Sequence, residues 1–226
     1  MAKNKKDNKA NKKNGKSTTP DVIHVQIVLD RSGSMSSIAA ATVDGLNGFL
    51  TKQRVVPGIC RLSLADFDSQ EPFRLLTDAI PIAEMRDLGP EDFQPRGATP
   101  LYDALGLAIE RCDARAAANP DEDQVLVIVT DGYENASTDF TGEQIAKLLK
   151  KRQAKSWTVL YLGANQDSFA VGNALNLSRG NVADFQATPD GVRSAFASAD
   201  LALSTHRSRE RHERMAKRDQ LFEEHR

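Results

Sequence analysis

Short apolar runs and longer amphipathic segments alternate along most of the chain. Continuous apolar runs of about four to eight residues are typical of strands buried on both faces, and apolar side chains spaced three or four residues apart are typical of helices. The first pattern predicts strands over residues 22–30, 124–131 and 156–162. Alternating apolar and polar residues predict a further strand over 61–68, and short edge strands are expected over 71–77 and within 176–185. The second pattern predicts helices over residues 38–54, 99–112, 141–149, 167–175 and 188–203.

Strands that alternate with helices predict an α/β fold, namely a doubly wound, mostly parallel central sheet with helices on both faces. Residues 71–77 follow the 61–68 strand so closely that we expect them to return beside it as one antiparallel edge strand. Residues 78–96 are rich in proline and acids and are expected to be irregular, with one short helical turn.

Charge divides the chain into three parts: an arm over residues 1–20, a domain over 21–205 and a helical tail over 206–226. The arm has seven lysines and one aspartate, a charge of +6, and residues 205–226 have seven basic and five acidic residues, a charge of +2. Because the whole chain carries −1, the part between them carries −9, which favours cation binding.

The two ends of the chain contain few apolar side chains. We expect the arm to be disordered, either as a solubilising tail or, less favoured, as a weak contact for nucleic acid or an acidic partner. The tail is expected to continue the last helix and fray outward. Its Leu221 and Phe222 are expected to touch a partner weakly rather than join the core.

Composition excludes several classes of protein. No apolar run reaches the roughly 18 residues of a membrane span, and no apolar segment follows the basic N-terminus as it would in a secretory signal. Cys60 and Cys112 give neither a disulfide framework nor a metal-binding spacing, so we expect two buried thiols. These features favour a cytoplasmic protein.

Oxygen-bearing side chains follow the first predicted strand. Asp30, Ser32 and Ser34 form the pattern Asp-x-Ser-x-Ser, and Gly33 between the serines is expected to supply unusual backbone angles for a turn. One carboxylate and two hydroxyls are hard ligands suited to Mg²⁺ or Mn²⁺, but they are too few to hold an ion alone.

Two further oxygen ligands lie at corresponding places in the chain. Thr99 stands at the head of an amphipathic helix, and Asp131 ends the 124–131 strand. Ligands in doubly wound sheets gather beyond the carboxyl ends of the strands, so Asp30 and Asp131 would share one crevice if their strands are neighbours. Two close carboxylates repel each other, and a divalent cation would relieve that repulsion.

Each of these motifs also has a structural interpretation. Ser32 and Ser34 could cap the next helix, Thr99 before proline is a good N-cap, and Asp131 before glycine is an ordinary turn signal. All three motifs occur together at the ends or starts of predicted elements, and this favours one shared metal site over separate caps and turns.

Other polar residues are weaker candidates. Asp68 is interpreted as a turn residue, with a supporting role at the same rim as the alternative. Four residues follow strand ends and are candidates for the rim only: Asn135, Asn165, Gln166 and Asp167. His24 lies inside a predicted strand and is expected to be structural. The other three histidines lie in the charged tail without ligand partners: His206, His212 and His225.

The three motifs together resemble the metal-ion-dependent adhesion site of von Willebrand factor A (VWA) domains, over roughly residues 22–205. All five metal-contacting positions of that family have matches here: Asp30, Ser32, Ser34, Thr99 and Asp131. The resemblance implies an ion with one open position, which a Glu or Asp side chain of a protein partner fills. It is closest to the intracellular type used by bacteria and phage, often beside AAA+ ATPases, chelatases or stress-response proteins.

The sequence favours a binding module over an enzyme. A phosphotransferase with an aspartate nucleophile would resemble Asp-x-Asp, whereas Ser32 stands at the second position here. No GxGxxG or Walker loop is present to hold phosphates, and no histidine in the neighbouring motifs could serve the serines as a base. The alternatives are a Mg²⁺- or Mn²⁺-dependent hydrolase or phosphate-binding enzyme, and a nucleic-acid-associated protein that uses residues 1–20.

Overall fold

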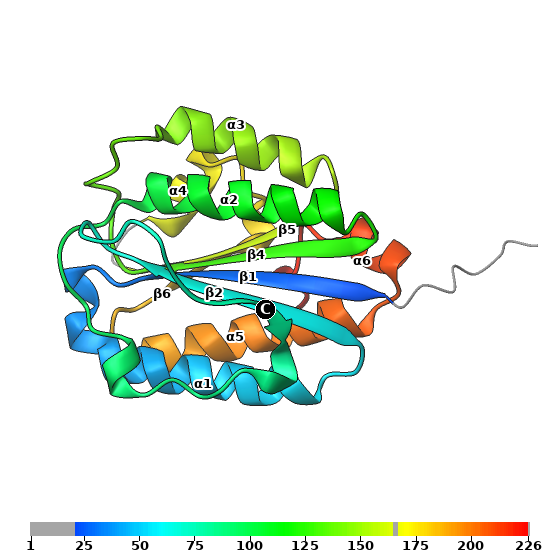
Figure 1. Cartoon of the computed structure of the whole chain (residues 1–226), viewed down its shortest axis with the longest axis horizontal. Coiled ribbons are helices and arrows are strands. Elements are labelled where there is room, and N and C mark those ends of the chain that lie inside the picture. The colour runs from blue at the N-terminus through cyan, green and yellow to red at the C-terminus, as the bar shows by residue number, and fades with distance from the viewer. Residues whose placement is uncertain (1–20, 165–166, 226) are drawn as a thin grey trace, which may run out of the picture.

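The computed structural model describes residues 21–164 and 167–225. A six-stranded sheet forms its centre, in the order β3-β2-β1-β4-β5-β6, as Figure 1 shows. The strands are β1 (Val22–Asp30), β2 (Ile59–Phe67), β3 (Arg74–Pro81), β4 (Glu122–Thr130), β5 (Thr158–Ala164) and β6 (Val182–Phe185). All neighbours pair in parallel except β2 and β3, which are antiparallel. The predicted doubly wound sheet with one antiparallel edge strand is therefore confirmed.

Helices cover both faces of the sheet (Figure 1). On one face lie α1 (Ala39–Val55) and α5 (Pro189–Ser208), and on the other lie α2 (Leu101–Ala118), α3 (Gly142–Gln153) and α4 (Ser168–Ala174). A short helix, α6 (Arg211–Lys217), sits at the edge where β1 begins. Short 3₁₀ helices lie at Gly33–Ile38, Ile82–Glu84, Pro90–Asp92, Arg179–Asn181 and Glu223–His225.

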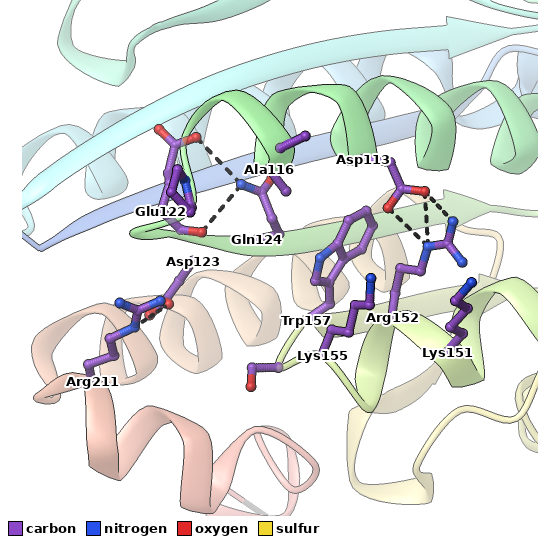
Figure 2. A pocket seen from close by; sticks show the side chains of 13 residues that line it. Asp113, Ala116, Glu122, Asp123, Gln124, Lys151, Arg152, Lys155, Trp157 and Arg211 are labelled. Atoms are coloured by element: carbon purple, nitrogen blue, oxygen red, sulfur yellow. Dashed lines mark hydrogen bonds and ion pairs between the residues drawn. The ribbon is translucent and has the colours of Figure 1, made fainter.

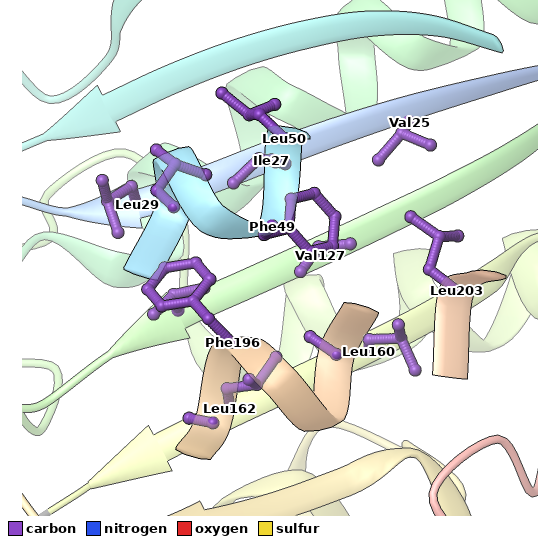
Figure 3. Close-up of a cluster of buried hydrophobic side chains, with 14 of the residues drawn as sticks. Val25, Ile27, Leu29, Phe49, Leu50, Val127, Leu160, Leu162, Phe196 and Leu203 are labelled. Carbon is purple, nitrogen blue, oxygen red and sulfur yellow. The ribbon is translucent and has the colours of Figure 1, made fainter. Parts of the chain in front are cut away.

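The buried side chains of β1 divide between the two faces, as the alternation of a strand requires. Val25, Ile27 and Leu29 pack with α1 and α5, whereas Val28 packs with α2 and α3. Figure 3 shows the first of these clusters, where side chains of α1 and α5 meet over the strands. Both faces are covered, so every side chain of β1 from Ile23 onward is buried, and its two interior polar residues, His24 and Gln26, are hydrogen-bonded.

The segment after α5 packs against the domain, which corrects the expectation for Leu221 and Phe222. Both side chains are buried in the same core cluster as α1 and α5. Their backbone is fixed as well: Leu221 N–H donates to Asn181 Oδ1 at 2.9 Å, and Phe222 N–H donates to the Gly180 carbonyl at 2.8 Å. Leu221 and Phe222 are isolated apolar residues among charged ones, so they show no helix or strand periodicity. Only their tertiary contacts show that they belong to the core.

Nor does this segment fray outward, because α6 is held by a buried ion pair. Arg214 is 1 % exposed, and its guanidinium donates to Asp123 Oδ2 at 2.9 Å from Nε and 2.6 Å from Nη2. Nη2 also reaches Asp21 Oδ1 at 2.6 Å, and Nη1 donates to the Arg209 carbonyl at 2.7 Å. One arginine therefore ties α6 to the starts of β1 and β4.

Several residues singled out in the sequence prove to be structural. His24 bonds Gln124 at 2.7 Å and Ser63 at 2.9 Å within the sheet, as expected. His206, placed by sequence on the charged tail, is buried, and burial lowers its pKa to about 3. Cys60 and Cys112 are both free and buried, as predicted.

Two expectations on the ends and loops fall outside the described residues, namely the arm over 1–20 and the rim candidates Asn165 and Gln166. In the part of the chain that the structure describes, no helix combines the length and apolar character needed to cross a membrane.

Candidate metal centre

The first ligand, Asp30, ends β1 at the carboxyl edge of the sheet. Its carboxylate is fully buried and is held by two donors: the Ser32 N–H at 2.7 Å to Oδ1, and the Thr130 hydroxyl at 2.6 Å to Oδ2. Because β1 and β4 pair in parallel, with Leu29 opposite Val129, Thr130 stands level with Asp30. The sheet itself therefore positions this carboxylate.

The two serine hydroxyls connect Asp30's loop to the second carboxylate. Ser32 Oγ and Ser34 Oγ lie 3.0 Å apart, and the Ser34 hydroxyl donates to Asp131 Oδ1 at 2.6 Å. Ser32 is the residue before the 3₁₀ turn that follows, but its side chain makes no capping bond. The capping interpretation of Ser32 is therefore wrong, and its hydroxyl faces the other oxygens.

Thr99 joins the same group, as the surroundings of Gly132 show. A Cβ placed on Gly132 would lie 3.4 Å from Thr99 Oγ1, 3.5 Å from Ser34 Oγ and 4.0 Å from Asp30 Oδ2. Three of the five predicted ligands therefore face one point beside a residue that has no side chain. With the bonds from Ser34 to Ser32 and Asp131, the structure brings all five together.

Thr99 does not cap α2. The helix begins at Leu101, Pro100 is its N-cap residue, and no side chain of the N-cap bonds there. The first N–H groups of α2 instead donate to the loop after β4. The Tyr102 N–H, for example, donates to Glu134 Oε2 at 2.9 Å. The Thr99 hydroxyl is thus left for the oxygen cluster.

The backbone of Thr99 is fixed from the same loop after β4. Asn135 Oδ1 accepts from the Thr99 N–H at 2.8 Å, and the Asn135 N–H donates to the Thr99 carbonyl at 3.1 Å. Asn135 was a rim candidate, and its role is to position Thr99. Glu134 was missed in the sequence, where an acid after a turn gave no signal.

Position 33 requires glycine for a different reason from the one expected. The glycines with positive φ in the described chain are Gly58 and Gly97, so Gly33 does not supply a left-handed turn. Its N–H donates to the Gly97 carbonyl at 3.0 Å, and a Cβ on Gly33 would lie 3.2 Å from that same oxygen. Close approach of the two loops is what requires glycine at this position.

Arg31 points away from the oxygen cluster and into a group of acids at the end of β2. Its guanidinium is 3 % exposed and lies 3.2 Å from Asp66, 2.7 Å from Asp68 and 3.1 Å from Glu71. Asp68 also accepts the Gln70 and Glu71 N–H groups, so it is both the predicted turn residue and a support, through Arg31, for the loop after β1. Local sequence carries no signal for the role of Arg31, because its partners are set by the pairing of β1 with β2.

The two carboxylates sit in surroundings that disfavour their charge. Burial raises the pKa of Asp30 to about 6, and the nearby charge of Asp131 adds to the effect. Burial also raises the pKa of Asp131, while the bond from Ser34 opposes that rise. The nearest arginine, Arg31, is committed to other acids, so a bound cation is the group that would stabilise both ionised forms.

The donor set fits a hard divalent cation. Within the described residues, no three His, Cys, Asp or Glu side chains gather as a metal site, so hydroxyl oxygens are needed beside the two carboxylates. Such an all-oxygen set suits Mg²⁺ or Mn²⁺ and gives no preference for Zn²⁺. Four of the five residues are buried, whereas Ser34 is exposed, so the cluster opens to solvent at that serine.

Comparison with known proteins gives fold neighbours only. No family model and no curated protein matches the sequence. Among solved structures, the chain is similar to mussel byssus proximal thread matrix protein 1 "with zinc occupied MIDAS motif", at 17% identity and a TM-score of 0.60 over 80% of this chain and 48% of that one. The present chain thus spans about half the length of that protein.

Two further neighbours show the same likeness. Manganese-loaded TRAP protein of Plasmodium vivax matches with a TM-score of 0.55 at 14% identity, over 77% of this chain and 72% of that one. The SpRpn10 VWA domain matches with a TM-score of 0.56 at 14% identity, over 78% of this chain and 94% of that one. Strand order, the single antiparallel edge strand and these likenesses identify the fold of this chain as that of a von Willebrand factor A domain.

Proposed function

We propose that this domain is a divalent-metal-dependent protein interaction module. The observation that carries the proposal is the convergence of two carboxylates and three hydroxyls at the carboxyl ends of β1 and β4. Asp30, Ser32, Ser34, Thr99 and Asp131 would hold one Mg²⁺ or Mn²⁺. Two neighbours in the same fold, named as zinc-occupied and manganese-loaded, support a metal at such an edge.

The partner's contribution follows from charge. When bound, the ion supplies an electrophilic centre for a further oxygen ligand, and two ionised aspartates neutralise its charge without filling a six-coordinate shell. A Glu or Asp side chain of a partner protein is the hard anionic oxygen that would complete it. Ser34 is the exposed member of the set, so a partner would approach over this residue.

Binding is favoured over turnover because no histidine among those described accompanies the serines. The histidines whose side chains are described lie elsewhere: His24 bonds within the sheet, His206 lies beside Thr158 at the start of β5, and His212 is exposed on α6. The hydroxyls of Ser32 and Ser34 lie 3.0 Å apart, the Ser34 hydroxyl donates to Asp131, and the Ser32 hydroxyl also bonds Asp30. Such hydroxyls suit metal coordination better than nucleophilic attack.

Finer parts of the proposal rest on the sequence resemblance. We infer an intracellular module of a bacterium or phage, whose partner is a separate AAA+ ATPase or stress-response protein. The basic arm over residues 1–20 adds, at most, a weak nucleic-acid contact that is sensitive to salt.

Metal binding is expected to require Asp131. Asp131→Asn keeps the shape of the side chain but removes an anionic ligand, so the affinity for Mn²⁺ should fall by about 100-fold or more. Isothermal titration of the purified protein with MnCl₂ measures this. Asp190→Asn is the matched control, since Asp190 is an exposed acid on α5 whose ion pair is with Arg193. Equal Mn²⁺ affinity in wild type and Asp131→Asn would contradict the site.

Partner capture is expected to depend on the same ion. Immobilised wild-type protein should retain its partner from source lysate with Mg²⁺, lose it in EDTA and regain it when Mg²⁺ is restored. Thr99→Val should fail to capture even with Mg²⁺, because one oxygen ligand is replaced by a methyl group of similar size. Capture that persists in EDTA would place the interaction on another surface.

The enzyme alternative is tested by the same proteins. A screen of phosphate esters and nucleotides with Mg²⁺ or Mn²⁺ should show no hydrolysis that Asp131→Asn abolishes. Robust hydrolysis lost in that variant, and kept in Asp190→Asn, would replace the interaction module by a metal-dependent hydrolase.

A further inference from the structure

A polar pocket lies at the edge of the sheet opposite the oxygen cluster, where β4 and β5 begin. Its volume is about 390 Å³, within the usual range for small-ligand sites. Figure 2 shows it between the ends of α2 and α3, with Arg211 of α6 at one side. The pocket shares no residue with the oxygen cluster, so any ligand here is independent of the metal.

The side of the pocket that α3 forms carries positively charged side chains, two of which have no ion-pair partner among the described residues. Lys151 and Lys155 are exposed and form no ion pair with a described residue. Arg152 directs Nε to both carboxylate oxygens of Asp113, at 3.0 and 3.1 Å, and Nη2 to one of them. Its Nη1 is buried and has no hydrogen-bond partner. This N–H donor has no acceptor within the described protein, a state that five other buried side-chain nitrogens share.

The acids of the pocket do not supply that acceptor, because each is already paired. Asp113 binds Arg152, Glu122 binds Arg115 at 2.6 Å, and Asp123 binds Arg214 at 2.6 Å and Arg211 at 2.9 Å. The ammonium groups of Lys151 and Lys155 are therefore surplus positive charge at the pocket.

The end of α3 does not oppose an anion as a helix C-terminus otherwise would. Its last carbonyls are occupied: Arg152 C=O accepts from the N–H groups of Lys155 at 2.8 Å and Trp157 at 3.1 Å. Ser156 closes this turn with φ of 77°, a left-handed conformation that usually selects glycine. The turn brings Lys155 and Trp157 to the same pocket as Lys151, at the cost of backbone strain.

An apolar surface adjoins the cationic wall. The indole of Trp157 lines the pocket, as Figure 2 shows, together with Ala116, Ala117 and Pro120 from the end of α2. Trp157 is 5 % exposed, so its ring is held rigidly by the core. A flat apolar group could pack here while an attached anion lies against the lysines.

We propose that this pocket binds a small organic phosphate. Its phosphate would lie against the ammonium groups of Lys151 and Lys155, and its flat apolar part would lie beside Trp157. A phosphate fits this wall better than a carboxylate, because a dianion balances two ammonium groups, whereas a carboxylate carries a single charge.

Trp157 is the single tryptophan of the chain, so its fluorescence reports on the pocket. The full-length protein is titrated in EDTA, which removes any contribution of metal-bound phosphate. The probes are AMP and phenyl phosphate, with adenosine as the phosphate-free match. Isothermal titration of the same pairs measures affinity where fluorescence does not change.

Two double variants test the lysines. Lys151→Gln/Lys155→Gln removes both pocket charges, and Lys147→Gln/Lys150→Gln removes two charges from positions of α3 outside the pocket. We expect wild type and the second variant to bind AMP or phenyl phosphate with a Kd below about 1 mM. Binding should weaken by about tenfold or more in the first variant, since two charge-assisted bonds are lost.

Three results would overturn the proposal. One is the absence of binding of both phosphates by wild type in both measurements. Another is equal affinity for AMP in the two double variants. The third is equal affinity of wild type for AMP and adenosine, which would show that the phosphate is not recognised. None of these outcomes bears on metal binding, which is measured separately with Asp131→Asn.

Discussion

Replacing Arg214 with methionine is expected to lower the free energy of unfolding by about 3–5 kcal/mol, the cost of removing one partner of a buried ion pair. Arg214 and Asp123 are only 1 % and 4 % exposed. Without the guanidinium, Asp123 would keep one partner, the half-exposed Arg211, and Asp21 would lose its own. The carbonyl of Arg209 would also lose its donor. Urea denaturation followed by circular dichroism gives the difference.

A matched surface substitution separates this effect from the loss of a charge. Arg193→Met removes an exposed pair with Asp190 on α5 and should change stability by no more than about 0.5 kcal/mol. The double variant Asp123→Asn/Arg214→Met should recover part of the loss, because the unpaired carboxylate is gone. Equal midpoints for Arg214→Met and Arg193→Met would show that α6 contributes little to folding.

Asp30→Asn is expected to stabilise the metal-free domain at pH 7.5. Burial raises the folded-state pKa of Asp30 to about 6 from an ordinary 3.8, so the folded protein holds this proton more tightly than the unfolded chain. The stability that protonation provides is full below pH 4 and is lost as pH rises through 6. Above that range the variant should exceed wild type by about 3 kcal/mol, the free-energy equivalent of the shift.

Thermal unfolding of both proteins in EDTA at pH 4.5 and 7.5 tests whether Asp30→Asn is the more stable protein at the higher pH. Only the difference between wild type and Asp30→Asn is informative, since other carboxylates, such as Asp92 with its lowered pKa, act in the opposite direction. The difference should be small at pH 4.5 and large at pH 7.5. Mn²⁺ at about 100 times its Kd should add about 2.7 kcal/mol to wild type and little to the variant. A variant that is less stable than wild type in EDTA at pH 7.5 would contradict the argument.

Much of the fold was accessible from local sequence. The largely apolar run that ends at Asp30 predicted β1 with its observed bounds, because strands covered on both faces are rich in apolar residues. The return of β3 beside β2 was also predicted, although it lies at Arg74–Pro81, later than the 71–77 expected. Strand edges shift in this way because backbone pairing, rather than local composition, decides where a ladder ends.

The candidate site was predictable for a similar reason. Asp30 and Asp131 follow strand ends, and parallel neighbours place such ends at one edge. The residues that hold the site in place could not be predicted from local sequence. Arg31 among its acids and Glu134 at the start of α2 depend on which strands and loops become neighbours. The roles of Leu221 and Phe222 likewise depend on tertiary neighbours, because their N–H groups donate to the Asn181 side chain and the Gly180 carbonyl.

The docking of the last segment has a consequence for synthesis on the ribosome. A chain emerges from its N-terminus, and domains generally fold as units during that process. Here the start of β1 is tied by Asp21 to Arg214, and the core beneath α1 and α5 is closed by Phe222. The nascent chain would thus carry a complete sheet whose α1 and α5 face still lacks Leu221 and Phe222 until the residues after α5 are released. During that interval the unfinished domain exposes the surface that chaperones recognise, so its yield should depend on them more than that of a fold completed early.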